Sequence, residues 1–169
     1  AMKVFTTTES ANQGGLKYKI ADHYGPVPSM WMLSYRIYPV KLGEAILSIG
    51  SDQNTVCLMG TDGDGIQVKD PSGKVIYKTG VGSGSSDFKF NDWNQLAFLV
   101  NEKEKTFRMF VNGQTASYGA DGGTVYDFPY RKPANSANML SFLATKEKEN
   151  EFYIDDVNAF AAAPFVTCE

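Results

Sequence analysis

The sequence has little of the residue chemistry that most catalytic and metal sites use. Its 169 residues include one histidine, His23, and two cysteines, Cys57 and Cys168. Neither cysteine has a cysteine or histidine partner at the spacing of a zinc site. His23 has no nearby serine, cysteine or aspartate arrangement of the kind that pairs a nucleophile with its base. The sequence therefore indicates neither a zinc site nor a histidine-dependent nucleophile.

The two cysteines leave two alternatives open. A disulfide between Cys57 and Cys168 would tie the C-terminal segment to a strand, as occurs in secreted proteins. Two free thiols agree with the sequence equally well, because the spacing does not decide between them.

A basic excess and long apolar runs are absent too. The formal charge is −3, so no surplus of positive charge is available for a phosphate backbone, and a nucleic-acid partner is not expected. No apolar run approaches the ~20 residues of a membrane-spanning helix, so membrane insertion is not expected. Hydrophobic residues make up 43% of the chain. This composition predicts one globular domain over residues 1–169, monomeric as a domain.

Amphipathic helices are missing as well, and alternating strands take their place. The clearest strand is MWMLSYRIYP, residues 30–39. Trp31 and Ile37 fall on one face, which we expect to point into the core, while Arg36 and Tyr38 fall on the other.

Short strands separated by turns fill most of the remaining chain. Further strands are expected at residues 15–22, 45–51, 55–60, 65–70, 74–79, 139–145 and 151–160. The sequence DPSG at residues 70–73 predicts a turn. Residues 80–87 are expected to form a flexible loop, and residues 114–136 a long irregular connection. This pattern predicts an all-β fold, a two-sheet antiparallel β-sandwich.

The segment WNQLAFLVNEKEKTFRMFVNG, residues 93–113, is predicted to be a β-hairpin. Phe98 and its alternating neighbours face inward, a charged turn reverses the chain, and Asn112-Gly113 supplies positive φ angles for the next turn. Trp93 is interpreted as an anchor in the core, as is Trp31.

Four segments in this order resemble the concanavalin A-like jelly roll, specifically its laminin-G-like branch. They are MLSYRIYP, AILSIGS, WNQLAFLV with FRMFVNG, and FYIDDVNAF. The resemblance spans residues 30–160. It implies a jelly-roll sandwich and, by analogy of fold, a lectin-like or carbohydrate-binding role.

Catalytic carboxylates of the kind found in glucanases of this fold are not present. Those enzymes carry a Glu-x-Asp-x-x-Glu array on one strand, which places an acid and a nucleophile on the same face. The acids of residues 146–151 alternate with lysines, which is typical of a solvated turn. A glycoside hydrolase or a polysaccharide lyase stays an alternative; the lyases need a cluster of His, Tyr, Arg and Gln, and only the last three are obvious.

Three aspartates are candidate ligands for a structural Ca²⁺. TDGDG at residues 61–65 resembles half a calcium loop, which makes Asp62 and Asp64 candidates, with a plain β-turn as the alternative. The resemblance adds Asp155 of the closing strand. By alternation Asp155 and Asp156 point to opposite faces, so at most one of them faces a metal.

Two groups of residues are candidates for sugar contact. Arg36, Tyr38 and Gln95 are expected on the outer face of the sheet that is concave in this fold. Aromatic faces pack on the C–H patches of sugars, and planar amide and guanidinium groups donate to hydroxyls. The second group comes from the long connection: Tyr118, Tyr126, Tyr130 and Arg131. The alternative is that these side chains only cover the sheet.

We therefore predict non-catalytic binding of a polysaccharide or oligosaccharide by a module of a larger extracellular or cell-surface protein. A laminin-G-like adhesion domain is a further alternative. It would be favoured by a flat apolar face that exposes Met30 and Met32.

Overall fold

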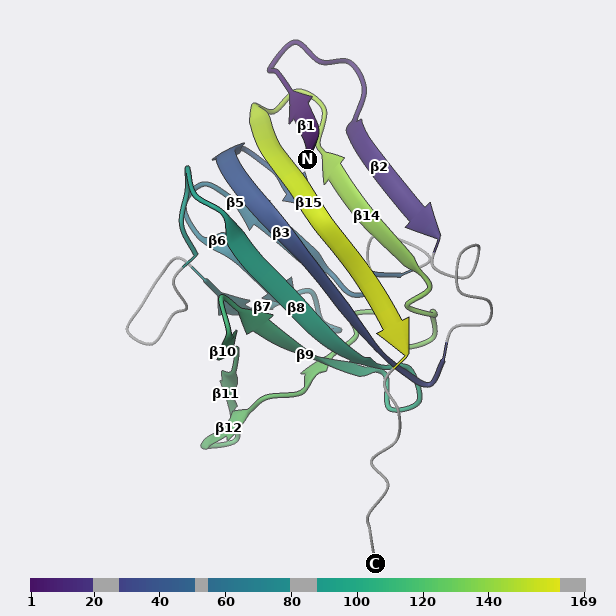
Figure 1. The fold of residues 1–169 in the computed structure, drawn as a ribbon. Coiled ribbons are helices and arrows are strands. Elements are labelled where there is room, and N and C mark those ends of the chain that lie inside the picture. Colours follow the sequence, from purple (N-terminus) through teal and green to yellow (C-terminus); the bar gives the residue numbers. More distant parts are fainter. Residues whose placement is uncertain (20–27, 51–54, 80–87, 162–169) are drawn as a thin grey trace, which may run out of the picture.

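Two antiparallel β-sheets pack against each other in the computed structural model (Figure 1). The structure describes residues 1–19, 28–50, 55–79 and 88–161. Within these ranges no helix is long and apolar enough to cross a bilayer. The predicted all-β, two-sheet antiparallel sandwich is confirmed. His23, Cys168 and the predicted loop at 80–87 lie outside the described residues.

Sheet A has seven strands in the order β1-β15-β3-β8-β9-β10, with β13 also paired to β9. They are β1 (Met2–Thr6), β3 (Met30–Leu42), β8 (Asn94–Asn101), β9 (Thr106–Val111), β10 (Gln114–Thr115), β13 (Phe128–Pro129) and β15 (Asn150–Ala161). The long strands β3, β8 and β15 run side by side across the front of Figure 1.

Sheet B has six strands in the order β2-β14-β4-β5-β6-β7. They are β2 (Gly14–Lys19), β4 (Ala45–Ile46), β5 (Leu58–Thr61), β6 (Gly65–Lys69), β7 (Val75–Lys78) and β14 (Met139–Ala144). A separate hairpin, β11 (Tyr118–Ala120) with β12 (Gly123–Val125), lies beyond the sandwich edge (Figure 1).

The core lies between the sheets and follows the alternation of β3. Trp31 is 1% exposed, which confirms its predicted place in the core. The Tyr35 ring stacks at 5.9 Å on Phe98 of β8 and meets Phe142 of sheet B edge-on at 4.8 Å. These rings join the two sheets, and the other face of β3 is left for solvent.

The two predicted turns are confirmed. In the DPSG turn, the backbone N–H of Gly73 donates to the carbonyl of Asp70 at 2.9 Å, and Gly73 has a φ of 84°. Asn112 and Gly113 have φ angles of 49° and 81°. Both residue types tolerate this left-handed backbone in a tight turn.

Two parts of the chain differ from the prediction. Residues 114–136 are not irregular, because four short strands, β10 to β13, lie within them. Phe128 stacks on Phe107 at 5.5 Å and holds this segment on the core. Strand β1 was not predicted; it completes the sheet edge by pairing with β15. A short strand at a sheet edge acquires its hydrogen bonds only from its distant partner.

Candidate functional site

Trp93 lies on the outer face of sheet A rather than in the core. The Arg36 guanidinium sits 4.8 Å from the centre of the Trp93 ring, and the Tyr38 ring meets it edge-on at 5.5 Å. The interpretation of Trp93 as a core anchor is therefore wrong. Asn94 and Leu96 point inward, so Trp93 alternates outward with Gln95. The odd spacing between Trp93 and Leu96 is the sequence signal that would have shown this.

The Trp93 ring begins a line of aromatic side chains that crosses the strands. The Tyr38 ring meets the Tyr153 ring of β15 edge-on at 6.1 Å, and these two residues are partners in the register. We call Trp93, Tyr38 and Tyr153 the aromatic row. All three side chains are half-buried, so the row presents ring edges and partial faces to solvent.

The row continues into a charged group on β1 and β15. The Lys3 ammonium lies 2.7 Å from the Glu151 carboxylate and 5.7 Å from the centre of the Tyr153 ring. The Tyr153 hydroxyl donates to the same carboxylate at 3.1 Å. Hydrogen bonds from Lys3 and then Tyr153 lower the pKa of Glu151, and the bond to Glu151 raises the pKa of Lys3. Lys3 and Glu151 therefore form an ion pair at this end of the row.

A shallow hollow of about 280 Å³ lies beside this charged group. Phe5, which is 59% exposed, stands at its edge. Its lining includes Lys3, Phe5, Thr7, Lys41, Glu149 and Glu151. The hollow thus combines an exposed ring with hydrogen-bonding side chains.

Arg36 is held from its other side by the closing strand. Its Nη1 donates to Oδ2 of Asp156 at 3.3 Å, and Asp155 lies opposite Arg36 in the register. Asp156 has a φ of 50°, and a bulge shifts the register between Asp155 and Asn158. The prediction that Asp155 and Asp156 point to opposite faces is wrong, because the bulge interrupts the alternation. The Asp156 N–H, the amino group of Ala1 and Arg36 all lower the pKa of Asp155.

The three predicted residues Arg36, Tyr38 and Gln95 therefore share one face. Arg36 and Gln95 are direct cross-strand partners on β3 and β8. Gln95 is exposed, whereas Arg36 and Tyr38 are half-buried. Trp93 belongs with them, although the sequence interpretation placed it elsewhere.

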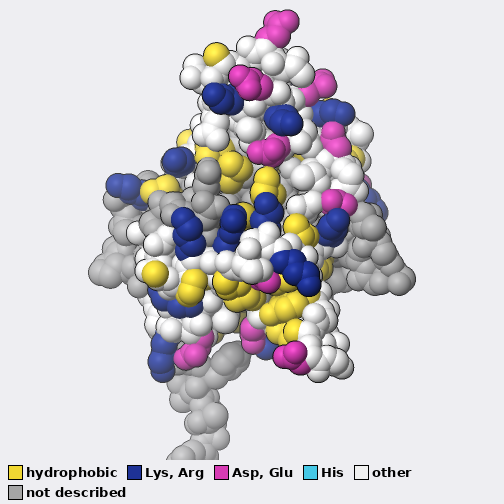
Figure 2. Space-filling view, turned by 180° about the vertical axis from the view of Figure 1, so that it is seen from behind, with side chains coloured by type: hydrophobic (Ala, Val, Ile, Leu, Met, Phe, Trp, Pro, Cys, Tyr) yellow, Lys and Arg dark blue, Asp and Glu magenta, His cyan; other side chains and the backbone are white. Residues whose placement is uncertain are grey.

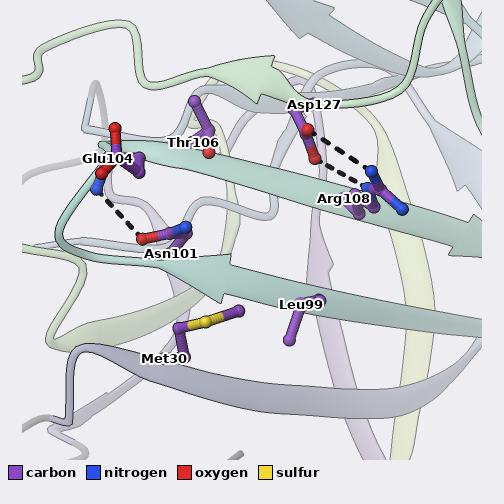
Figure 3. Close-up of a pocket in the computed structure, with 7 residues that line it drawn as sticks. All are labelled: Met30, Leu99, Asn101, Glu104, Thr106, Arg108 and Asp127. Atoms are coloured by element: carbon purple, nitrogen blue, oxygen red, sulfur yellow. Dashed lines mark hydrogen bonds and ion pairs between the residues drawn. The ribbon is translucent and has the colours of Figure 1, made fainter. Parts of the chain in front are cut away.

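A larger hollow of about 410 Å³ lies at the opposite end of the same face (Figure 3). Met30 and Leu99 form one side of it, and Arg108 lies on the other side with Asp127. Arg108 holds both oxygens of Asp127, at 2.7 Å from Nε and 3.5 Å from Nη2. This bond raises the pKa of Arg108. The sequence analysis missed this hollow because its residues come from three strands and two connections, with no local spacing to mark them.

The second predicted group does not gather at one place. Tyr130 is fully buried and its hydroxyl donates to Glu102 at 2.8 Å, so its assignment as a ligand-binding residue is wrong. Tyr118 packs against Phe128 at 4.9 Å, and Tyr126 is 46% exposed. These tyrosines are divided between the core and the surface because the segment folds into strands.

Arg131, the fourth member of that group, lies near sheet B. Its Nη1 is 3.7 Å from Sγ of Cys57, a buried free thiol. Arg131 is thus remote from Arg36 and Tyr38, which lie on the outer face of the other sheet.

The three predicted calcium ligands do not come together. Asp62 accepts from the Leu42 amide at 2.6 Å and pairs with Lys41 at 2.9 Å. Asp64 pairs with Lys78 at 3.2 Å, and Asp155 is held as described above. Among the described residues no group of three or more His, Cys, Asp or Glu side chains could hold a metal ion. Calcium binding stays a prediction.

Comparisons with known proteins support the fold. Neither a protein-family model nor a curated protein matches the sequence. A sialidase structure matches with a TM-score of 0.61 and 11% identity, over 88% of this chain and 14% of the sialidase chain. Sheep galectin-11, in complex with glycerol, matches with a TM-score of 0.52 and 15% identity, over 86% of this chain and 97% of its own.

A third structure is botulinum neurotoxin type C, which depends on interaction with two ganglioside molecules to enter cells. It matches with a TM-score of 0.54 and 14% identity, over 94% of this chain and 39% of the toxin chain. Structural matches at such low sequence identity show only the fold of this chain, which is the concanavalin A-like jelly roll. The chain thus spans a minor part of the sialidase and of the toxin.

Proposed function

We propose that this domain binds an oligosaccharide or polysaccharide, without cleaving it, on the outer face of sheet A. The observation that carries the proposal is the position of the Arg36 guanidinium over the Trp93 ring, with Tyr38 and Gln95 beside them. This arrangement offers aromatic surface for the C–H patches of a sugar ring. It also offers guanidinium, amide and phenol groups for its hydroxyls.

The charges on this face favour a ligand that is recognised through its own hydroxyl groups rather than through its net charge. All four cations on the strands of sheet A are ion-paired: Lys3 with Glu151, Arg36 with Asp156, Lys41 with Asp62 and Arg108 with Asp127. A paired cation keeps free N–H donors but has little net field. Sugar hydroxyls suit such donors.

Two of the alternatives, a glycoside hydrolase and an adhesion domain, can be compared with the described residues of this face. The hollow of Figure 3 contains two carboxylates, Glu104 and Asp127, but Arg108 holds both oxygens of Asp127, so it is poorly placed to act as an acid or a nucleophile. The adhesion reading needs an exposed apolar patch at Met30 and Met32. Both are half-buried, and Met32 lies in the register between Leu99 and Phe160, which is 54% exposed, so an adhesion role is the alternative if no glycan binds.

The proposal includes the setting predicted from the sequence. The domain would act as a lectin-like module of a larger extracellular or cell-surface protein, with calcium as a structural ion if one is bound. The resemblance to carbohydrate-binding jelly rolls supports this setting.

A glycan array with the wild type and with Trp93→Ala tests the proposal, run once with calcium and once with EDTA. Selective binding that Trp93→Ala removes would support it. A blank array from a folded wild type would overturn it, and so would binding that Trp93→Ala leaves intact. Loss of binding in EDTA would assign a role to calcium and would make Asp62, Asp64 and Asp155 the first residues to substitute.

A further inference from the structure

The two sheets differ sharply in charge. The strands of sheet B contain four lysines, Lys17, Lys19, Lys69 and Lys78, and no aspartate or glutamate. The strands of sheet A carry four cations and three acids, and each of those cations is ion-paired. Within the described residues of sheet B only Lys78 forms an ion pair, with Asp64. A chain with a net charge of −3 thus keeps unpaired positive charge on one sheet.

All four lysines of sheet B point away from the core. Lys17 and Lys19 are exposed and alternate with residues that face the sandwich. Lys69 follows the buried Val68, and Lys78 is the cross-strand partner of Gln67. Figure 2 views the molecule from behind and shows Lys and Arg side chains in a band across the middle of this face.

The strand register places two of these lysines at the ends of one line across the sheet. Lys17 lies opposite Ser141 on β14, whose amide donates to the carbonyl of Ser48. Ser48 lies opposite Cys57, because its neighbours Leu47 and Ile49 bond to Leu58 and Val56. The Lys69 amide donates to the carbonyl of Cys57. We call Lys17, Ser141, Ser48, Cys57 and Lys69 the cross-strand line.

The middle of this line is buried and uncharged, and its two ends are lysines. Ser141, Ser48 and Cys57 are 3%, 1% and 4% exposed and have small side chains. The guanidinium of Arg131 reaches the line at Cys57, at 3.7 Å from its sulfur. Four strand spacings of ~4.8 Å put the two end lysines on strands about 19 Å apart. Positive charge therefore lies at both ends of the line and, through Arg131, on the strand next to Lys69.

We propose that the outer face of sheet B binds an acidic polysaccharide, a sugar chain that bears carboxylate or sulfate groups. Such a chain lying across the strands would bring its acidic groups to Lys17, Arg131 and Lys69 in turn. Duplex DNA is a poorer match, because it carries one charge per ~1.7 Å of axis and the lysines here are much further apart. This inference shares with the proposed function a glycan as ligand but uses the opposite face, so each can fail without the other.

The experiment measures binding of the full chain to polygalacturonate and to dextran sulfate, at low and at high salt. Neutral dextran and duplex DNA serve as comparison ligands. The test variant combines Lys17→Gln with Lys69→Gln. A control with the same change in net charge combines Lys103→Gln with Lys148→Gln, two exposed lysines in the turns that precede β9 and β15 of sheet A. Thermal melting of each variant establishes that it is folded.

We expect the wild type to bind at least one polyanion at low salt and to lose it at high salt. The Lys17/Lys69 variant should bind about tenfold more weakly, and the control variant as tightly as the wild type. Equal weakening by the control variant, DNA bound as tightly as the polysaccharides, or no polyanion bound would each overturn the inference. Loss of neutral-glycan binding in Trp93→Ala reports on the other face and leaves this result unaffected.

Discussion

The guanidinium carbon of Arg36 lies over the Trp93 ring at 4.8 Å from its centre, while Nη1 of the same group donates to Asp156 at 3.3 Å. The residues come from β3 and from the turn before β8, two strands that pair directly. A cation over an indole at a surface contributes on the order of 0.5–1 kcal/mol. This energy orders both side chains before any ligand arrives, which reduces the entropy lost on binding.

Trp93→Ala and Trp31→Ala should separate binding from stability. Trp93 is half-buried on the outer face, so its loss should abolish glycan binding and lower the free energy of unfolding by only about 1 kcal/mol. Trp31 is 1% exposed, and its loss should cost about 3–5 kcal/mol. Denaturant unfolding and glycan affinity of both variants measure this. A similar loss of stability in both variants would show that Trp93 is buried in the core, as Trp31 is.

Arg36→Lys should weaken glycan binding several-fold although the charge is kept. A lysine loses the planar group that stacks on Trp93 and the geometry of the bond to Asp156. Arg108→Lys is the matched control, because Arg108 is also ion-paired on sheet A but lies at the far hollow. Titration calorimetry with a glycan identified by the array compares the two. Equal weakening would extend the site along the whole face.

Tyr35→Phe should leave the free energy of unfolding unchanged or raise it. Among the described residues the buried Tyr35 hydroxyl has no hydrogen-bond partner, and burial raises the pKa of this phenol. Removing an unpaired buried hydroxyl removes its desolvation cost. Tyr130→Phe is the control; its hydroxyl donates to Glu102, so its loss should cost about 1–3 kcal/mol. Urea unfolding curves of both variants measure these free energies. A clear loss of stability in Tyr35→Phe would show that the Tyr35 hydroxyl has a hydrogen-bond partner.

Protonation of Glu102 in acid should lower the free energy of unfolding of the domain. Partial burial raises the pKa of this carboxyl, but hydrogen bonds from Lys105, the Ala137 amide and Tyr130 outweigh burial and hold the pKa below 4.5. A carboxyl whose pKa is lower in the folded than in the unfolded chain stabilises the fold. This stabilisation is complete at a pH above the unfolded-state pKa, and it is lost as the pH falls through the folded-state pKa.

The measurement is the free energy of unfolding as the pH falls from neutral to below 4.5, the ordinary value for this carboxyl. Glu102→Gln should be less stable than the wild type at neutral pH, and the difference should shrink in acid. Glu104→Gln, at an exposed neighbour in the same turn, should follow the wild type. A constant difference between Glu102→Gln and the wild type would contradict the assignment.

Several features could be predicted because they depend on short stretches of chain. The alternation of residues 30–39 places Trp31 inward and Arg36 outward, and both positions are confirmed. Asn112-Gly113 specifies its turn through the few residues that tolerate positive φ. Within one strand the period of two relates each side chain to its neighbours without reference to the rest of the fold.

The errors arose where the alternation is interrupted, or where a segment that folds into short strands was predicted to be an irregular connection. Asp156 sits in a bulge with positive φ, so counting from Asp155 gives the wrong face. Tyr130 follows the short strand β13, whose pairing with β9 draws the segment toward the core. Neither the bulge nor the pairing of β13 has a strong signal in the nearby sequence, because each depends on hydrogen bonds to the neighbouring strand.

The sequence by itself determined the all-β character, the main strands and the inner face of the longest one. Only the tertiary structure decided which outward side chains meet. Arg36, Trp93 and Tyr153 form one surface because β8, β3 and β15 are neighbours in sheet A. Lys17 and Lys69 lie on the same cross-strand line because β2 and β6 are both strands of sheet B. Alternation fixes a side chain's direction within its own strand, but strand order and register are set by the packing of the whole core.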